Sequence, residues 1–137
     1  TFGSSEALSF TMNSICDPGD EVIIPEPFYA NYNGFAQASD VKVIPVTSKI
    51  EDHFAFPPLD SFREKINKTT TAIIICNPCN PTVYVYSTDA IIVIATLSQK
   101  HTFFPSLERH SIPNEPVPEN RSSIFEFNKS TLLSVEC

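Results

Sequence analysis

Two cysteines and two Asn-Pro pairs lie close together in the stretch TAIIICNPCNPTVYV, residues 71–85. Cys76 and Cys79 have the spacing of a redox dithiol or of half a zinc site. A thioredoxin-like dithiol needs its first cysteine at a helix start, but Pro81 and the β-branched residues after it disfavour a helix there. For zinc, Cys137 is distant and the three histidines are scattered. We therefore expect no metal site and keep a Cys76/Cys79 redox protein as an alternative.

The same stretch also suits the binding of a polar ligand. Its two X-Pro units, Asn77-Pro78 and Asn80-Pro81, are predicted to hold the chain extended beyond a strand and to remove two N–H donors. The side-chain amide of Asn80 would then project into the crevice at the strand end, where it can both donate and accept hydrogen bonds.

A second candidate site lies in the opening octet TFGSSEAL, where Gly3, Ser4 and Ser5 precede a predicted helix. Unpaired N–H groups and the helix dipole make such a helix start suitable for an anion such as phosphate. The octet alone favours the simpler interpretation, an ordinary serine N-cap. It matches neither a Walker loop nor the Gly-x-Gly-x-x-Gly fingerprint.

Aromatic residues in IPEPFYANYNGF follow the next predicted strand. An aromatic ring at the carboxyl end of a strand can lie flat against a planar ligand, and Tyr29 is placed for this. Phe28, Tyr32 and Phe35 have nearly helical spacing, which predicts that they line the packed face of a helix.

These residues are placed by an alternation of helical and strand-like segments. Helices are predicted from Ser4 or Ser5 to the DPGDE turn at 17–21, and over 28–38, 57–66 and 87–100; strands are predicted over 21–25, 41–46 and 71–76. This order indicates an α/β fold, a partial three-layer sandwich with a mostly parallel sheet between helices. Ligands then bind at the carboxyl ends of the strands.

The chain is divided into a folded part at 1–104 and a divergent, irregular tail at 105–137. The segment PSLERHSIPNEPVPENRSS is rich in proline and has no sustained period, which predicts irregular structure. SIFEF at 123–127 is a candidate isolated strand. The abrupt start at Thr1, without methionine, suggests a fragment.

Composition restricts the partners. The 137 residues include 16 acidic and 9 basic side chains, for a net charge of −7. Because no basic cluster is present, we expect no nucleic-acid partner. The longest apolar run, 90–97, is too short to span a bilayer, so we expect no membrane association and a cytoplasmic location.

Four stretches, in their order along the chain, resemble the large domain of class I/II aminotransferases: TFGSSEAL, DPGDEVIIPEPFYANY, TAIIICNPCNPT and VYS. Within this family, an aspartate-aminotransferase-like member is the nearest. These fold-type-I enzymes use pyridoxal 5'-phosphate. The resemblance covers residues 1 to about 104. It implies that Gly3, Ser4 and Ser5 bind the cofactor phosphate and that Tyr29 stacks on the pyridine ring. It also implies that Asn80 binds near the phenolic oxygen and the substrate carboxylate.

The resemblance implies amino-group transfer between an amino acid and a 2-oxo acid, in amino-acid metabolism, by an intact enzyme that is a homodimer. Two departures follow Asn80. Val83 stands where the family's Pro-Thr-Gly has glycine. The family's next strand ends in an aspartate that pairs with the pyridine nitrogen, whereas HTFFPSLERHS here contains Pro105 and has Glu108 out of register.

No lysine is assigned to hold the cofactor. Lys129, in EFNKST, resembles the lysine motif, but it comes too early and lacks the downstream Gly-x-Arg. The family's small domain has no counterpart either. We therefore assign no catalytic residue and predict that the chain alone is inactive. The alternative is a non-enzymatic remnant, an interaction module that pairs with a full-length relative.

Overall fold

The computed structural model describes residues 3–100 and 131–135. Its elements follow the order α1 (Ser4–Ile15), β1 (Glu21–Glu26), α2 (Asn31–Ala38), β2 (Lys42–Thr47), the 3-10 turn η1 (Ile50–Asp52), α3 (Leu59–Arg63), β3 (Thr70–Cys76), α4 (Thr88–Lys100) and β4 (Thr131–Val135).

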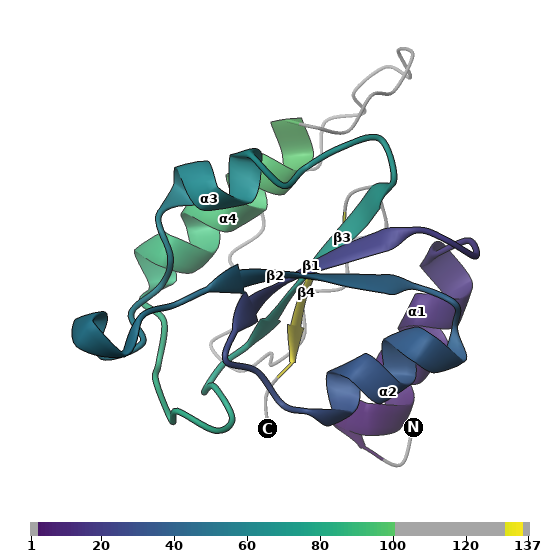
Figure 1. Cartoon of the computed structure of the whole chain (residues 1–137), viewed down its shortest axis with the longest axis horizontal. Helices are drawn as coiled ribbons and strands as arrows, with labels where there is room; N and C mark the ends of the chain where they lie inside the picture. The colour runs from purple at the N-terminus through teal and green to yellow at the C-terminus, as the bar shows by residue number, and fades with distance from the viewer. Residues whose placement is uncertain (1–2, 101–130, 136–137) are drawn as a thin grey trace, which may run out of the picture.

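The four strands form one parallel sheet in the order β2-β1-β3-β4. Figure 1 shows α1 and α2 on one face of this sheet and α3 and α4 on the other, so the described part has three layers. The predicted α/β sandwich is confirmed. Because all strands are parallel, their carboxyl ends meet at one edge, called the carboxyl edge below, and their amino ends meet at the opposite amino edge.

Two hydrophobic cores lie on the two faces of the sheet. Successive side chains of a strand point to opposite faces, and in β1 Val22 and Ile24 pack with α1 and α2 while Ile23 packs with α3 and α4. The run of isoleucines in β3 is divided in the same way, with Ile74 on the first face. This explains why β1 and β3 lack polar alternation, as expected for strands covered on both faces.

The helices contribute apolar stripes to these cores. Leu8 and Met12 of α1 are buried and Ile15 is partly buried, as their spacing predicts. On the opposite face, Phe62 of α3 and Ile94 of α4 have no exposed surface. Burying side chains of this size stabilises the fold by about 1.5–3 kcal/mol each.

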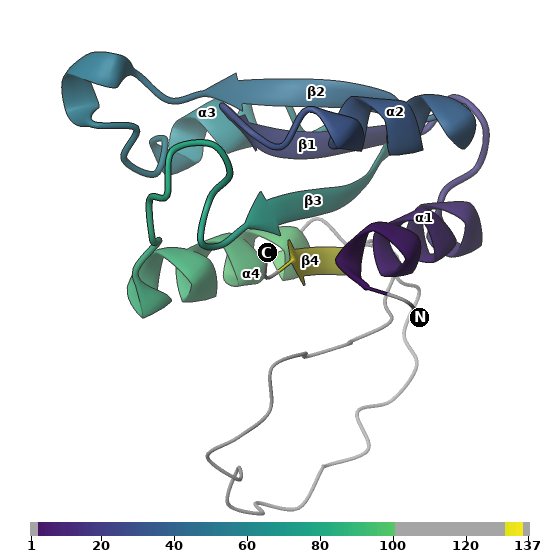
Figure 2. The ribbon, with the colours of Figure 1, turned by 90° about the horizontal axis from the view of Figure 1, so that it is seen from below.

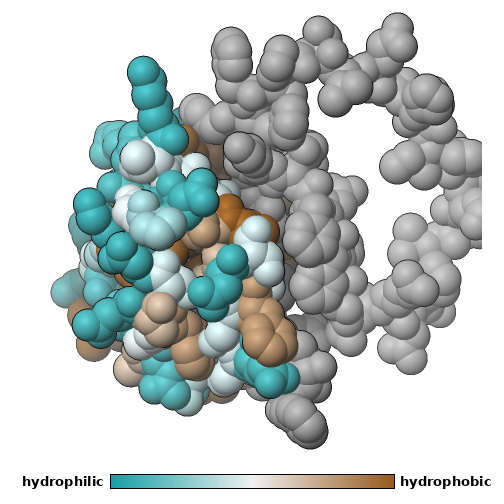
Figure 3. All heavy atoms as spheres, turned by 90° about the vertical axis from the view of Figure 1, so that its right-hand side faces the viewer, coloured by the Kyte–Doolittle hydropathy of each residue, from teal (hydrophilic) through white to brown (hydrophobic). Residues whose placement is uncertain are grey.

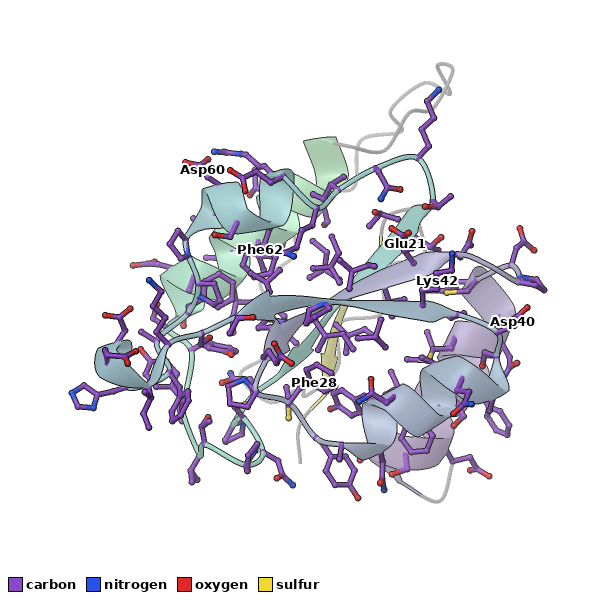
Figure 4. The ribbon with its side chains drawn as sticks, in the orientation of Figure 1. Glu21, Phe28, Asp40, Lys42, Asp60 and Phe62 are labelled. Carbon is purple, nitrogen blue, oxygen red and sulfur yellow. The ribbon has the colours of Figure 1, made fainter. Side chains whose placement is uncertain are left out.

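A turn at the amino edge leads from α1 into β1. Gly19 has φ 89°, and its N–H donates to the carbonyl of Asp40, 2.7 Å away. The carboxylate of Asp20 accepts hydrogen bonds from the Asp17 N–H at 2.9 Å and from the Thr71 hydroxyl at 2.7 Å. The loops that enter the strands are therefore tied together at this edge, where Figure 4 labels Glu21, Asp40 and Lys42.

Two predictions need correction, and one element was not predicted. The helix predicted over 28–38 begins only at Asn31, so Phe28 and Tyr29 lie in a loop. The segment 131–135, predicted to be irregular, pairs with β3 as β4, because an exposed edge of β3 offers free N–H and C=O groups. The 3-10 turn η1 was not predicted. The candidate strand 123–127 lies outside the described residues. Within the described ranges, no helix has both the length and the apolar character to cross a bilayer.

Figure 3 views the side of the molecule that lies at the right of Figure 1. Hydrophilic and apolar residues are mixed over the coloured part of this surface.

Candidate functional site

The three predicted ligand segments meet the sheet at the same edge. Tyr29 follows β1 and Asn80 follows β3, and these parallel strands end at the carboxyl edge. Figure 2 shows α1 running opposite to the strands, so its first turn points toward that edge too. The topology therefore places all three segments where parallel sheets bind ligands, as the sequence predicts.

Helix α1 begins without a side-chain cap. Gly3 is the N-cap residue, with φ 134°, and Ser4 and Ser5 occupy the first turn with exposed side chains. The N–H of Ala7 donates to the Gly3 carbonyl at 3.1 Å, and the preceding N–H groups lie ahead of the intrahelical ladder. The serine N-cap interpretation is therefore wrong, because the cap position is held by glycine.

The loop after β1 positions Tyr29 against the core. Its ring lies edge-on to Tyr32, with centroids 5.8 Å apart, and its hydroxyl accepts a hydrogen bond from the Asn31 amide at 2.7 Å. Tyr32 is buried and Phe35 packs against the same core, both on the helix as predicted, whereas Phe28 packs against this core from the loop. Figure 4 shows Phe28 beyond the end of β1. Tyr29 is half-buried, so part of its ring surface stays open to a ligand.

The loop after β3 is a compact turn and not the extended segment expected from its prolines. The N–H of Cys79 donates to the Tyr84 carbonyl at 2.9 Å, and the N–H of Val83 donates to the Cys79 carbonyl at 2.6 Å. The bonds from Asn77 to Pro78 and from Asn80 to Pro81 are both cis. These local hydrogen bonds fold the chain back on itself. Asn80 is exposed at the tip of this turn.

Both thiols of the turn are buried and hydrogen-bonded. The Cys76 thiol donates to the Pro78 carbonyl at 3.4 Å and accepts from the Asn80 N–H at 3.4 Å. The Cys79 thiol donates to the Pro27 carbonyl at 3.1 Å. Reactive dithiols need some exposure and a helix start at the first cysteine. This turn has neither feature, because the next helix, α4, begins at Thr88.

A buried tyrosine completes the base of the turn. The pKa of Tyr86 is raised above its usual range by burial, then by the nearby Cys79 and Cys76, and by a hydrogen bond to Cys79. The Tyr86 N–H donates to the side-chain oxygen of Asn77 at 2.9 Å. The hydrogen bond between Asn77 and Tyr86 was not predicted from the sequence. Asparagine before proline is a common turn residue, but spacing alone does not indicate a partner nine residues away.

Val83 lies in a backbone conformation that suits glycine. Its φ is 57°, and 76% of its surface is exposed. A β-branched side chain in this region is strained. Val83, which replaces the glycine of the family's Pro-Thr-Gly, thus lies at a positive φ that glycine adopts more easily.

Among the described residues, no group of three or more cysteine, histidine, aspartate or glutamate side chains could hold a metal ion. The candidate site combines a helix start with small residues, a half-buried tyrosine and an exposed asparagine, groups that can offer a polar ligand ring stacking and hydrogen bonds.

Known aminotransferases are similar to most of this chain. A family model for aminotransferases of class I and II matches residues 1–107. The chain is 36% identical over 88 residues to an aspartate aminotransferase of Pinus pinaster, covering 64% of this chain and 18% of the relative. It is also 36% identical over 101 residues to the putative aminotransferase YugH of Bacillus subtilis, covering 74% of this chain and 26% of the relative.

Solved structures show the same similarity. An aspartate aminotransferase double mutant of Thermus thermophilus superposes with a TM-score of 0.71 and 33% identity, covering 76% of this chain and 27% of that one. An alanine aminotransferase of Pyrococcus furiosus gives a TM-score of 0.66 and 31% identity, covering 72% and 25%. The chain thus spans about a quarter or less of the length of these relatives.

Proposed function

Because the chain belongs to the class I and II aminotransferase family, we propose that residues 3–86 form part of the pyridoxal 5'-phosphate site of such an enzyme. The family's reaction moves an amino group between an amino acid and a 2-oxo acid. When bound, the cofactor ring supplies an electron sink for the α-carbon of the amino acid. The observation that carries the proposal is that three separate ligand segments reach the same edge of one parallel sheet.

The start of α1 fits a phosphate group. A Cβ on Gly3 would meet no atom within 4 Å, so the space beside the helix start is open. The hydroxyls of Ser4 and Ser5 are exposed in the first turn, and no side-chain cap occupies the position. Backbone N–H groups and the helix dipole favour an anion at this position. We assign the phosphate of the cofactor to these three residues.

Tyr29 and Asn80 would hold the cofactor ring from the other two segments. Tyr29 offers a half-buried aromatic face that is already fixed by Tyr32 and Asn31. A fixed ring loses little freedom on stacking, which favours binding. Asn80 offers a side-chain amide that can donate to an oxygen of the ring or of the substrate carboxylate.

The 137 residues alone are proposed not to transfer amino groups. Transamination needs a lysine that holds the cofactor and then moves the proton at the α-carbon. No lysine of this chain matches that position within the segments that resemble the family. A homodimer, the identity of the amino acid and a cytoplasmic location remain predictions for the whole protein.

Titration of the purified chain with pyridoxal 5'-phosphate and with pyridoxal, followed by equilibrium dialysis, tests the proposal. We expect the phosphate form to bind about tenfold or more tightly, because charge-assisted hydrogen bonds to the helix start are lost with the phosphate. Replacing both Ser4 and Ser5 with alanine should reduce this difference. Equal binding of the two compounds to the original chain would contradict the phosphate assignment.

The ring contacts are tested with Tyr29→Leu and Asn80→Ala. Each should weaken binding of pyridoxal 5'-phosphate about fivefold, which corresponds to one lost contact of about 1 kcal/mol. Tyr84→Leu is the matched control, since Tyr84 packs against the core of the opposite face. Borohydride treatment at equimolar cofactor should leave every lysine unmodified by mass spectrometry. A pyridoxyl-lysine would show that the chain does hold the cofactor covalently.

A further inference from the structure

Cys79 occupies the centre of the turn after β3, and its side chain points inward while its neighbours do not. Pro78 and Asn80 on either side are exposed, whereas Cys79 is only 4% exposed. Its thiol reaches the carbonyl of Pro27, 3.1 Å away, across 52 residues of sequence. Pro27 lies two residues before Tyr29, and Cys79 lies one residue before Asn80. The two ligand-bearing loops are therefore joined by one side-chain hydrogen bond.

The backbone N–H and carbonyl of Cys79 are also hydrogen-bonded. Its N–H donates to the Tyr84 carbonyl at 2.9 Å, and its carbonyl accepts from the Val83 N–H at 2.6 Å. Its thiol also lies close enough to the buried Tyr86 to contribute to the raised pKa of that tyrosine. A thiol fixed in this way cannot move without disturbing either the turn or the loop after β1. The hydrogen bond of this thiol to Pro27 is therefore a direct link between the two loops.

We propose that Cys79 is a positioning residue that clamps the loop of Asn80 to the loop of Tyr29, so that the two ligand contacts form one preorganised cradle. This inference rests on the proposed function for the identity of the ligand, but the clamp itself is a property of the chain without ligand. Preorganisation of this kind increases affinity because the cost of ordering the two loops is met during folding. The thiol contributes by its hydrogen bond and not by redox chemistry or metal binding.

Amide hydrogen exchange of the full chain without cofactor tests the clamp directly. The Tyr32 N–H, which donates to the Tyr29 carbonyl at 2.9 Å, reports on the first loop, and the Val83 N–H reports on the second. In Cys79→Ala both amides should exchange about five- to tenfold faster, because one buried hydrogen bond is lost. Cys79→Ser keeps a donor at the same position and should restore most of the protection.

The Lys42 N–H is the internal control. It donates to the Asp20 carbonyl at 2.8 Å at the amino edge, far from the clamp. Its exchange should stay unchanged in both variants if they are folded. Faster exchange at Val83 alone, with Tyr32 unaffected, would show that Cys79 supports only its own turn and would overturn the clamp.

Binding of pyridoxal 5'-phosphate tests the positioning role separately. Cys79→Ala should weaken binding about fivefold and Cys79→Ser less than twofold. In a Tyr29→Leu background the effect of Cys79→Ala should become smaller, because one of the two loops that Cys79 positions no longer carries a ligand contact. Unchanged affinity in Cys79→Ala would overturn the positioning role. If the original chain binds no cofactor at all, the proposed function fails, while the exchange experiment still decides the clamp.

Discussion

The turn that leads into β1 and the turn that leaves β3 each contain a residue with positive φ. At the amino edge this residue is Gly19, with φ 89°, and at the carboxyl edge it is Val83, with φ 57°. Glycine adopts such angles freely, whereas a β-branched residue does so only under strain. Gly19 thus suits the backbone conformation of the turn into β1, whereas Val83 does not suit that of the turn after β3.

The two turns also differ in what holds them. The amino-edge turn is held by the Asp20 carboxylate, which bonds to Asp17 and Thr71. The turn after β3 is held by backbone hydrogen bonds of Cys79 and by the side chain of Asn77. Strain is tolerated where surrounding contacts determine the backbone, and such strain often lies near functional sites. The turn after β3 is thus less relaxed than the turn that leads into β1.

The largest effect is expected from giving the amino-edge turn the same mismatch. Gly19→Val should reduce the free energy of unfolding by about 2 kcal/mol, because it places a β-branched residue at positive φ. A Cβ at Gly19 meets no atom within 4 Å, so the cost comes from the backbone alone. Urea unfolding followed by circular dichroism measures it. Gly34→Val, in helix α2 with equally open space, should change stability by less than about 0.5 kcal/mol. Equal losses at the two glycines would contradict the argument.

A smaller loss of stability is expected from removing the Asn77 side chain, which closes the turn after β3. Asn77→Ala should reduce the free energy of unfolding by about 1–2 kcal/mol, because the N–H of the buried Tyr86 loses its acceptor. Asn77→Asp keeps an acceptor oxygen and should recover part of this loss. Thermal unfolding of the three proteins at pH 7 distinguishes these cases. An unchanged midpoint in Asn77→Ala would show that this hydrogen bond does not hold the turn.

Relieving the mismatch at Val83 should stabilise the chain slightly. Val83→Gly should raise the free energy of unfolding by roughly 0.5 kcal/mol, the relief of left-handed strain less the entropy that glycine loses on folding. The exposed Val83 side chain gives up little packing in this change. Val85→Gly is the matched control, since Val85 is also exposed but has no positive φ. It should destabilise by a similar amount. A loss in both variants would mean that Val83 is not strained.

Cys16 directly precedes the turn that leads into β1, and its thiol should make the stability of the fold depend on pH. Burial, followed by the charges of Asp20 and Asp17, raises the pKa of the Cys16 thiol from 9.0 to about 11. The folded state therefore holds this proton more tightly than the unfolded state. The stability that this contributes is complete below about pH 9 and is lost as the pH rises toward 11.

Iodoacetamide labelling followed by peptide mass spectrometry measures this ionisation. The labelling rate of Cys16 should reach half its plateau near pH 11 in the folded chain and about two units lower in urea. Asp20→Asn should lower the folded value, since it removes one of the nearby charges. The same midpoint in the folded and unfolded chain would contradict the burial argument.

Much of the fold could be predicted from the chain alone. The apolar spacing in α1, the isoleucine-rich runs of β1 and β3 and the DPGDE turn each indicate the element that forms, because they depend on neighbouring residues. Strand β4 was not predicted, because its pairing with β3 depends on a partner more than fifty residues away. The start of α2 was predicted three residues early, since helical spacing continues into the loop that carries Phe28 and Tyr29.

Part of the candidate site could also be predicted from the sequence, and part could not. The small residues before α1, the aromatic after β1 and the asparagine after β3 could be found in the sequence, because a parallel sheet brings the ends of its strands to one edge. The compact shape of the turn at 77–83 could not be predicted from its prolines. It depends on hydrogen bonds from Cys79 to Tyr84 and from Tyr86 to Asn77.

The sequence by itself determined the order of the helices and strands from α1 to α4, the family and the candidate ligand residues, because periodicity and short motifs are local properties of the chain. Only the tertiary structure decided that Gly3 and not a serine caps α1, that Val83 lies at positive φ, and that the Cys79 thiol meets the Pro27 carbonyl. Backbone angles and contacts between distant loops follow from packing the two cores against one sheet. No short stretch of sequence contains that information.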